Sequence, residues 1–234
     1  MGTAANDGSM AETLPECVEI PAPGTHRWTV LWLHGLGADG HDFEPIVPEL
    51  RLPADHGIRF VFPHAPHRPV TINGGMRMRA WYDITGPDLA GREDEAGILG
   101  SIATVEALIA AEGARGIPPE RVILAGFSQG GAIACHGGLR HPETLAGIVV
   151  LSAYLPLADR LDGAAIRANH DTPIFQAHGR QDPVVPPSLG HYSQQRIAAL
   201  RPAPEWREYD MAHGVCAQEI DDLRAWLQGR VGAI

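Results

Sequence analysis

A serine between closely spaced glycines is the feature of this sequence with the clearest potential for chemistry. The stretch Gly126–Gly130 fits the pattern G-x-S-x-G, with Ser128 at its centre. The apolar run Val122–Phe127 leads into it, and a stretch of small residues with helical character follows it. A serine on a sharp turn between a strand and a helix exposes its hydroxyl, and flanking glycines avoid steric clashes there. The pattern predicts that Ser128 is a nucleophile; a serine that only caps a helix is the alternative.

A histidine must remove the serine proton, because a serine hydroxyl alone is a weak nucleophile. Where this turn occurs, the acidic partner follows the serine in the chain and the histidine comes last. His191 and His213 satisfy this order. His191 lies in a helical pattern, whereas His213 stands between an expected strand and an expected helix, and Gly214 permits a turn after it. We therefore predict His213 as the base, with a histidine that only caps the helix as the alternative.

A carboxylate has to orient that histidine and stabilise its positive charge. Asp182 follows the apolar run Ile174–Ala177 in the sequence RQDPVVP, and Pro183 restricts the backbone beside it. We therefore predict Asp182 as the acid. Asp210 is nearer to His213 in sequence, but it also fits a helix N-cap. The other carboxylates between the serine and the histidine are Glu143, Asp159, Asp162, Asp171, Glu205 and Glu208.

Two backbone amides are expected to bind the oxyanion that forms during acyl transfer. One is the amide of Gln129, the residue after the predicted nucleophile. The other is the amide of Leu36, because the loop His34–Gly37 follows an early apolar run and its glycines allow an N–H to point inward. His34 could instead be a metal ligand or a base, but we expect its ring to bond to the loop backbone. His64 and His178, which also stand at strand ends, are expected to have similar structural roles.

Short apolar runs alternate with helical patterns along most of the chain. The expected strands are Trp28–Leu33, Ile58–Phe62, Val122–Phe127, Ile148–Leu151, Ile174–Ala177 and Trp206–Tyr209. The expected helices are Glu93–Glu112, Gly130–Leu139, Leu189–Leu200 and Val215–Leu227. Near-continuous apolar runs are typical of parallel strands buried on both faces. The pattern predicts the α/β class, with a mostly parallel, doubly wound sheet, helices on both faces and a ligand crevice at the carboxyl ends of the strands.

Two segments stand apart from this alternation. Residues 1–16 are small and polar, and we expect a disordered tail there, followed by a single domain over residues 17–234. Residues 64–91 are rich in glycine and proline and have weak periodicity, which is typical of a functional loop. Trp81 and Tyr82 within this loop argue against simple disorder, so we expect a flap over the site.

The composition excludes several other functions. The 234 residues have a formal net charge of −10 and all 18 basic residues are arginine, so neither nucleic acid nor an anionic membrane is an expected partner. The absence of lysine excludes a Ser–Lys pair. No apolar run approaches the roughly 18 residues of a membrane-spanning helix. The three cysteines form no C-x-x-C pair, and we expect no metal. We find no signal peptide and expect a cytoplasmic location.

A family resemblance is carried by the stretches LHGLGADGHDF, PHAPHRPVTINGGMRMRAWYDI, ILAGFSQGGAIA, PIFQAHGRQDPVVP and MAHGV. From about Trp28 to Leu227 the chain resembles the phospholipase/carboxylesterase family of α/β-hydrolases, which includes bacterial carboxylesterases and acyl-protein thioesterases. The resemblance implies the α/β-hydrolase fold and a triad of Ser128, Asp182 and His213. It also implies an oxyanion hole formed by the Leu36 and Gln129 amides, no metal, no organic cofactor and often a homodimer.

The resemblance also indicates which residues surround the acyl group. It implies that Trp81 lines or covers the acyl site, and we expect Leu155 and Val184 to border the substrate as well. Tyr82 stands where members of the family commonly have phenylalanine, which adds a polar group near this site.

The expected function is hydrolysis of a small-molecule carboxylic ester by a serine carboxylesterase. The acyl chain would be small or medium, and the reaction would pass through an acyl-enzyme. The alternative is an acyl-protein thioesterase or lysophospholipase, which would act on long-chain acyl thioesters or lysolipids with the same chemistry. A protein of the same fold that binds a small ligand without catalysis is a third possibility, which the complete triad disfavours.

Overall fold

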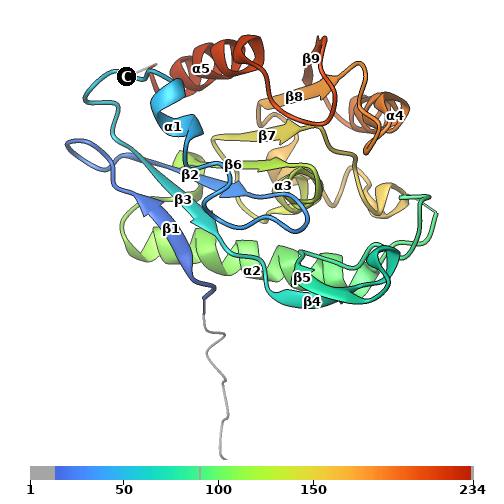
Figure 1. The fold of residues 1–234 in the computed structure, drawn as a ribbon. Helices are drawn as coiled ribbons and strands as arrows, with labels where there is room; N and C mark the ends of the chain where they lie inside the picture. Colours follow the sequence, from blue (N-terminus) through green and yellow to red (C-terminus); the bar gives the residue numbers. More distant parts are fainter. Residues whose placement is uncertain (1–13, 90, 233–234) are drawn as a thin grey trace, which may run out of the picture.

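Seven strands form one central sheet in the computed structural model, which describes residues 14–89 and 91–232 (Figure 1). In spatial order the strands are β1 (Cys17–Ile20), β3 (Ile58–Pro63), β2 (Trp28–Leu33), β6 (Val122–Phe127), β7 (Gly147–Leu151), β8 (Ile174–Gly179) and β9 (Glu205–Tyr209). From β3 to β9 all neighbours are parallel, and β1 pairs with β3 in the antiparallel sense. The predicted fold class is therefore confirmed. Most of the tail expected over residues 1–16 lies outside the described residues, and residues 14–16 have no regular structure.

Successive side chains of a strand point to opposite faces of the sheet, so strands made of consecutive apolar residues have two apolar faces. Helices cover both of these faces. The helices are α1 (Ile46–Glu49), α2 (Glu95–Ala114), α3 (Gln129–Arg140), α4 (Pro187–Ala198) and α5 (Ala217–Val231). Leu31 and Leu33 of β2 belong to one apolar cluster with α2 and α3. Val30 and Trp32 of the same strand belong to a second cluster with α1 and α5. Figure 1 shows α2 on one side of the sheet and α1 and α5 on the other.

The direction in which strands are added to the sheet reverses between β2 and β6. The next strand of the sheet along the chain after β2 is β3, on one side, whereas β7 follows β6 on the other. The segments that leave β2 and β6 therefore diverge, which opens a crevice at the carboxyl ends of these two strands. The loop His34–Gly37, called the oxyanion loop below, leaves β2 at this point, and Ser128 directly follows β6.

The segment 64–91 has more regular structure than its composition suggests. β4 (His67–Val70) and β5 (Met76–Arg79) form an antiparallel hairpin around a 3-10 turn at Thr71–Asn73. The Gly37 N–H donates to the Arg79 carbonyl at 2.9 Å, so the hairpin is joined to the oxyanion loop. The first half of this segment therefore contains a hairpin that the sequence did not predict, and its role as a flap over the site stays a prediction. Short polar strands carry no apolar pattern that would reveal them in the sequence.

By length and composition alone, α2 could cross a membrane. Our expectation that no apolar stretch approaches such a length overlooked it, because two glutamates interrupt the run. In the structure α2 packs on the sheet through its buried residues Ile98, Ser101, Ile102, Val105, Leu108, Ile109 and Glu112. Asp94 caps the helix by accepting a hydrogen bond from the Gly97 N–H at 2.9 Å. Packing against the sheet accounts for the apolar stripe of α2.

Candidate active site

The turn that carries Ser128 has a strained backbone. Ser128 has φ of +53° and ψ of −121°, a region that L-residues rarely adopt. A Cβ on Gly126 would lie 2.6 Å from the Gly131 nitrogen, and one on Gly130 would lie 2.5 Å from the His34 carbonyl oxygen. Only glycine fits these two positions, because the turn packs directly on its own backbone and on the oxyanion loop. This close packing holds Ser128 at the carboxyl edge of the sheet.

Three side chains that follow three different strands form a continuous series of contacts. Ser128 Oγ lies 2.9 Å from His213 Nε2, and His213 Nδ1 lies 2.7 Å from Asp182 Oδ2. The His213 side chain is 16% exposed, whereas that of Asp182 is fully buried. The His213 ring packs on Phe127, with the ring centroids 4.7 Å apart. The structure thus brings together the three residues that the sequence singles out, in a geometry suited to moving the serine proton onto the imidazole.

The loop after β8 holds the Asp182 carboxylate in place. Asp182 Oδ1 accepts hydrogen bonds from the N–H groups of Val184 and Val185, at 2.8 and 2.9 Å. His178 Nε2 donates to the Val185 carbonyl at 2.8 Å and lies 3.5 Å from Asp182 Oδ2. Burial lowers the pKa of His178, so the ring stays neutral at this position. These backbone donors were not foreseen from the sequence, since any residue supplies an N–H and only the folded loop shows where it points.

The oxyanion loop lies against the serine. A Cβ on Gly35 would be 3.5 Å from the Ser128 Cβ. Within the part of the chain that the structure describes, the N–H groups of Leu36 and Gln129 have no hydrogen-bond acceptor. Two free N–H groups on the segments that flank a nucleophile are suited to stabilising an oxyanion. The His34 ring bonds to the loop backbone, since its Nδ1 lies 2.8 Å from the Gly35 carbonyl oxygen.

Comparison with known proteins identifies the family. A family model described as Phospholipase/Carboxylesterase matches residues 16–230. The chain belongs to this family. Acyl-protein thioesterase 1 of Neurospora crassa is 39% identical over 221 residues, which covers 91% of this chain and 90% of the relative. The protein of the same name from Yarrowia lipolytica is 36% identical over 219 residues, which covers 92% and 96%.

A solved structure supports the same conclusion. Acyl-protein thioesterase 2 of Zea mays superposes with a TM-score of 0.80 at 28% identity, covering 93% of this chain and all of that one. This member of the phospholipase/carboxylesterase family therefore has the α/β-hydrolase fold and is a hydrolase.

The residues expected around the acyl group of this family member have different environments. Leu155 lines a cavity of about 240 Å³ between the loop after β7 and α4. The Val184 side chain is exposed beside Asp182. Trp81 is fully buried, and its indole N–H donates to the His34 carbonyl at 2.9 Å. The Trp81 side chain thus lies in the core against the oxyanion loop, and its expected role of lining or covering the acyl site stays a prediction.

Two tyrosines meet beside the Leu155 cavity. Tyr82 OH lies 3.1 Å from Tyr154 OH, and both side chains are buried. Tyr154 also lines the cavity that contains Leu155. Burial raises the pKa of Tyr154 to about 12, so its hydroxyl keeps its proton at neutral pH. The polar group that Tyr82 adds is therefore bonded to a second hydroxyl.

The alternatives to the predicted base and acid take part in other contacts. His191 Nε2 lies 2.8 Å from Glu208 Oε1 on the surface. Asp210 accepts a hydrogen bond from the Gln181 side chain at 2.6 Å, and Asp171 Oδ1 lies 2.8 Å from His170 Nδ1. His64 accepts a hydrogen bond from the Gly40 N–H at 3.0 Å. None of these side chains is bonded to Ser128 in the described part of the chain.

Metal ligation finds no support among residues 14–89 and 91–232. No group of three His, Cys, Asp or Glu side chains gathers there in a way that could hold a metal ion. The three cysteines are free thiols, and burial raises the pKa of Cys135 to about 12 and that of Cys17 to about 11. These two thiols are therefore poor ligands and poor nucleophiles.

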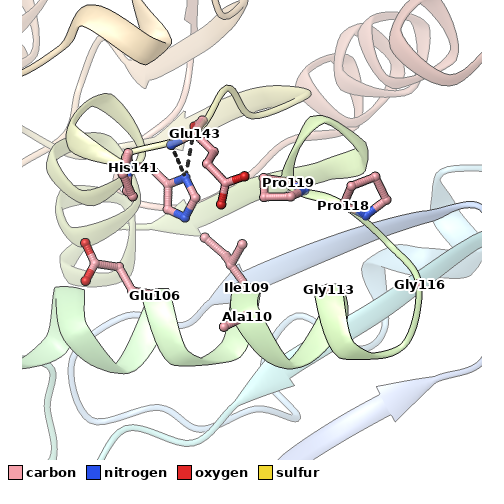
Figure 2. A pocket seen from close by; sticks show the side chains of 10 residues that line it. Glu106, Ile109, Ala110, Gly113, Gly116, Pro118, Pro119, His141 and Glu143 are labelled. Atoms are coloured by element: carbon pink, nitrogen blue, oxygen red, sulfur yellow. Dashed lines mark hydrogen bonds between the residues drawn. The ribbon is translucent and has the colours of Figure 1, made fainter.

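A larger groove lies at the opposite edge of the sheet (Figure 2). It has a volume of about 710 Å³ and runs between the second half of α2, the prolines before β6 and the segment His141–Glu143 before β7. Figure 2 shows the His141 ring bonded to the backbone of Glu143, with Ile109 beneath it. Because these segments precede strands whose carboxyl ends carry the site, the groove is remote from Ser128.

Proposed function

We propose that this hydrolase cleaves acyl thioesters, with Ser128 as the nucleophile, His213 as the base and Asp182 as the acid. The unbroken contacts from Ser128 Oγ through the His213 ring to Asp182 Oδ2 carry the proposal. The sequence alone favours esters with small or medium acyl chains and leaves thioesters as the alternative. The comparisons favour that alternative, since relatives at 36% and 39% identity over most of both chains are named acyl-protein thioesterase 1.

The reaction would proceed in two halves. Ser128 Oγ attacks the acyl carbon while its proton moves across the 2.9 Å contact to His213 Nε2. The tetrahedral intermediate collapses, its carbon–sulfur bond breaks, and the leaving thiolate takes the proton from His213. Water then gives a proton to His213 and its oxygen attacks the acyl carbon. The bond from this carbon to Ser128 Oγ breaks, Oγ takes the proton back from His213, and a carboxylic acid leaves. Asp182 accepts the hydrogen bond of His213 Nδ1 and stabilises the imidazolium.

The oxyanion would form between the two segments that leave β2 and β6. The free N–H groups of Leu36 and Gln129 would donate to it. The positive end of the α3 dipole also points toward this position, because α3 begins at Gln129. These groups are fixed before substrate binds, so no reorganisation is needed as charge develops.

Ester hydrolysis is a second candidate, which the family description supports. A thiolate is a better leaving group than an alkoxide, so acylation by a thioester depends less on proton donation from His213. The same site therefore serves both substrates, and the leaving group sets only the relative rates.

Replacement of Ser128 tests the nucleophile. Ser128→Ala should lower kcat for an acyl thioester by about 10⁶-fold, because among residues 14–89 and 91–232 no other hydroxyl bonds to the His213 ring. Ser152→Ala is a matched control, since Ser152 is buried at the end of the neighbouring strand β7 and its Oγ has no partner among the described residues. A fluorophosphonate should label the wild-type protein on Ser128. Absence of labelling, or near wild-type turnover of Ser128→Ala, would contradict the proposal.

A matched series of substrates tests the choice between thioester and ester. Thioesters and oxygen esters of the same acyl groups, from short to long, should be compared by kcat/KM. The proposal expects higher values for long-chain thioesters. A preference for short oxygen esters would instead support the carboxylesterase, and a preference for lysolipids would support a lysophospholipase.

We also propose the setting in which the enzyme acts. It would work in the cytoplasm on an acylated small molecule or peptide, without inserting into a membrane or binding nucleic acid. A homodimer is the proposed oligomeric state, which analytical ultracentrifugation would check.

A further inference from the structure

The direction of the Leu36 N–H depends on the carbonyl group of Gly35. These two groups belong to the same peptide unit, and in a planar trans peptide they point in opposite directions. Whatever holds the Gly35 oxygen therefore also aims the Leu36 N–H. His34 Nδ1 lies 2.8 Å from that oxygen, and the Ala38 N–H donates to it over a longer distance of 3.3 Å. The shortest contact that fixes this peptide comes from the His34 side chain.

The His34 ring can make this contact as a donor in only one tautomer. The Ala65 N–H donates to His34 Nε2 at 3.0 Å, so Nε2 carries no proton and Nδ1 must carry it. His34 Nδ1 then donates to the Gly35 carbonyl. Burial lowers the pKa of His34 to about 4, so the ring stays neutral near pH 7. The protein thus keeps the tautomer that points a donor at the Gly35 oxygen.

Further contacts fix this arrangement relative to the nucleophile. The Trp81 indole N–H donates to the His34 carbonyl at 2.9 Å. The Gln129 side chain accepts from the Trp81 N–H at 2.8 Å and donates to the Tyr82 carbonyl at 2.7 Å. Gln129 directly follows Ser128, so the oxyanion loop is tied through Trp81 to the turn that carries the serine. Because these contacts hold the loop in place, the loop as a whole cannot shift to restore the direction of the Leu36 N–H if the Gly35–Leu36 peptide rotates.

We propose that the His34 imidazole is a positioning residue that aims the Leu36 N–H at the oxyanion; this inference rests on the proposed function of Ser128. Without the Nδ1 donor, only the longer contact from the Ala38 N–H holds the Gly35 oxygen, so the Gly35–Leu36 peptide is less firmly held and the N–H is less well aimed at the oxyanion. The bound substrate carries no oxyanion, so kcat should fall while KM changes little. Loss of one oxyanion donor lowers kcat by about 10²–10³-fold, and a misdirected donor should cost about 10–100-fold.

Two replacements separate the nitrogens of His34. His34→Asn keeps a nitrogen donor separated from Cα by the same number of bonds as Nδ1, and it removes Nε2. His34→Gln keeps a polar group separated from Cα by the same number of bonds as Nε2, and it removes Nδ1. We expect His34→Asn to keep kcat within about 5-fold of wild type and His34→Gln to lose about 10–100-fold, with KM within about 3-fold in both. Circular dichroism would confirm that both variants are folded.

His141 provides a matched control at the other edge of the sheet (Figure 2). It is buried like His34, and its Nδ1 also contacts a nearby backbone carbonyl, that of Glu143 at 2.9 Å. His141→Gln therefore removes a similar local bond and should leave kcat unchanged. If His34→Gln does not fold, Trp81→Phe tests the same loop by removing the donor to the His34 carbonyl, which lies in the preceding His34–Gly35 peptide. Trp32→Phe is its control, since Trp32 is buried and its Nε1 has no partner in the described part of the chain.

An alkyl boronic acid gives a second readout, because it forms a tetrahedral adduct on a reactive serine. Its inhibition constant should rise in His34→Gln by the same factor by which kcat falls. Equal kcat in His34→Asn and His34→Gln, or an equal loss in His141→Gln, would overturn the inference. If one of these results is found and a fluorophosphonate still labels wild-type Ser128, only the role of His34 is overturned and the proposed function stands. If it does not label Ser128, the proposed function fails and the role of His34 fails with it.

Discussion

At the scale of single residues, the Asp182 carboxylate shows how the site divides its contacts. One oxygen accepts two backbone N–H groups of its own loop, and the other faces His213. Because the first oxygen already accepts two hydrogen bonds, the second oxygen is the one that accepts a hydrogen bond from His213 Nδ1–H. That bond leaves His213 Nε2 unprotonated and able to accept the proton of Ser128. The backbone of one loop thereby determines the tautomer of a ring on another.

The substitution Asp182→Asn tests this division of contacts. The oxygen of the introduced amide would accept from the two backbone N–H groups, so its NH₂ group would face His213 Nδ1 as a donor and favour the tautomer with the proton on Nε2. We expect kcat of Asp182→Asn to fall by about 10³–10⁴-fold with little change in fold. Asp171→Asn is the control, because Asp171 is exposed and contacts His170 before β8 begins. Steady-state kinetics would check both, and equal activity of the two variants would argue against the role of Asp182.

At the scale of elements, the turn between β6 and α3 depends on the absence of side chains. A Cβ on Gly126 would collide with the Gly130 carbonyl carbon and lie 2.6 Å from the Gly131 nitrogen. Gly126→Ala should therefore destabilise the fold by about 2–4 kcal/mol, because backbone atoms cannot move aside cheaply. Gly100→Ala in α2 should instead stabilise it by about 0.5–1 kcal/mol, since the added methyl group has nothing within 4 Å. Urea unfolding would measure both, and a neutral Gly126→Ala would contradict this account of the turn.

The elements that carry the site were predictable because their patterns are local. The apolar runs Trp28–Leu33 and Val122–Phe127 match β2 and β6 residue for residue, and glycine spacing marked the turn after β6. β1 was missed because it has only four residues, none of them fully buried. The β4–β5 hairpin was missed because tertiary bonds, such as that between Gly37 and Arg79, fix its position.

Among the residues of the site, too, local sequence patterns revealed some roles, whereas roles that depend on tertiary contacts stayed hidden. The order Ser, Asp, His along the chain singled out the three side chains that the structure brings into contact. The supporting bonds of His34 and Trp81 depend on which backbone groups approach their rings, and no sequence pattern shows this. The bond from Trp81 to the His34 carbonyl in the core was likewise not foreseen from the sequence.

At the scale of the whole molecule, one edge of a parallel sheet collects residues that are distant in sequence. Ser128 and His213 are 85 positions apart, and Asp182 and His213 are 31 positions apart. β6, β8 and β9 run in the same direction, so the loops after them emerge at the same edge. The loop that carries His213 leads directly into α5, so the packing of α5 helps to fix the position of His213. A buried acid, Glu219, lies at the start of this helix.

Glu219 makes global stability depend on pH. It lies in the first turn of α5 and is fully buried, and neither of its side-chain oxygens has a hydrogen-bond partner among the described residues. Burial raises its pKa from 4.5 to about 8, and the nearby negative charge of Asp222 adds to this. Between these two values the folded state holds a proton that the unfolded chain releases, so the free energy of unfolding falls as pH rises through this window. The loss across the whole window is on the order of 5 kcal/mol.

The variant Glu219→Gln removes this titration and should flatten the dependence. Relative to wild type, its free energy of unfolding should increase progressively as pH rises from 4.5 to about 8 and then level off. Repulsion from the net charge of −10 destabilises both proteins, so their difference isolates the buried carboxyl. Glu106→Gln, at an exposed side chain of α2, should leave the wild-type curve unchanged. Urea unfolding between about pH 5 and about pH 9 would measure all three proteins, and parallel curves for wild type and Glu219→Gln would show that Glu219 does not titrate in this window.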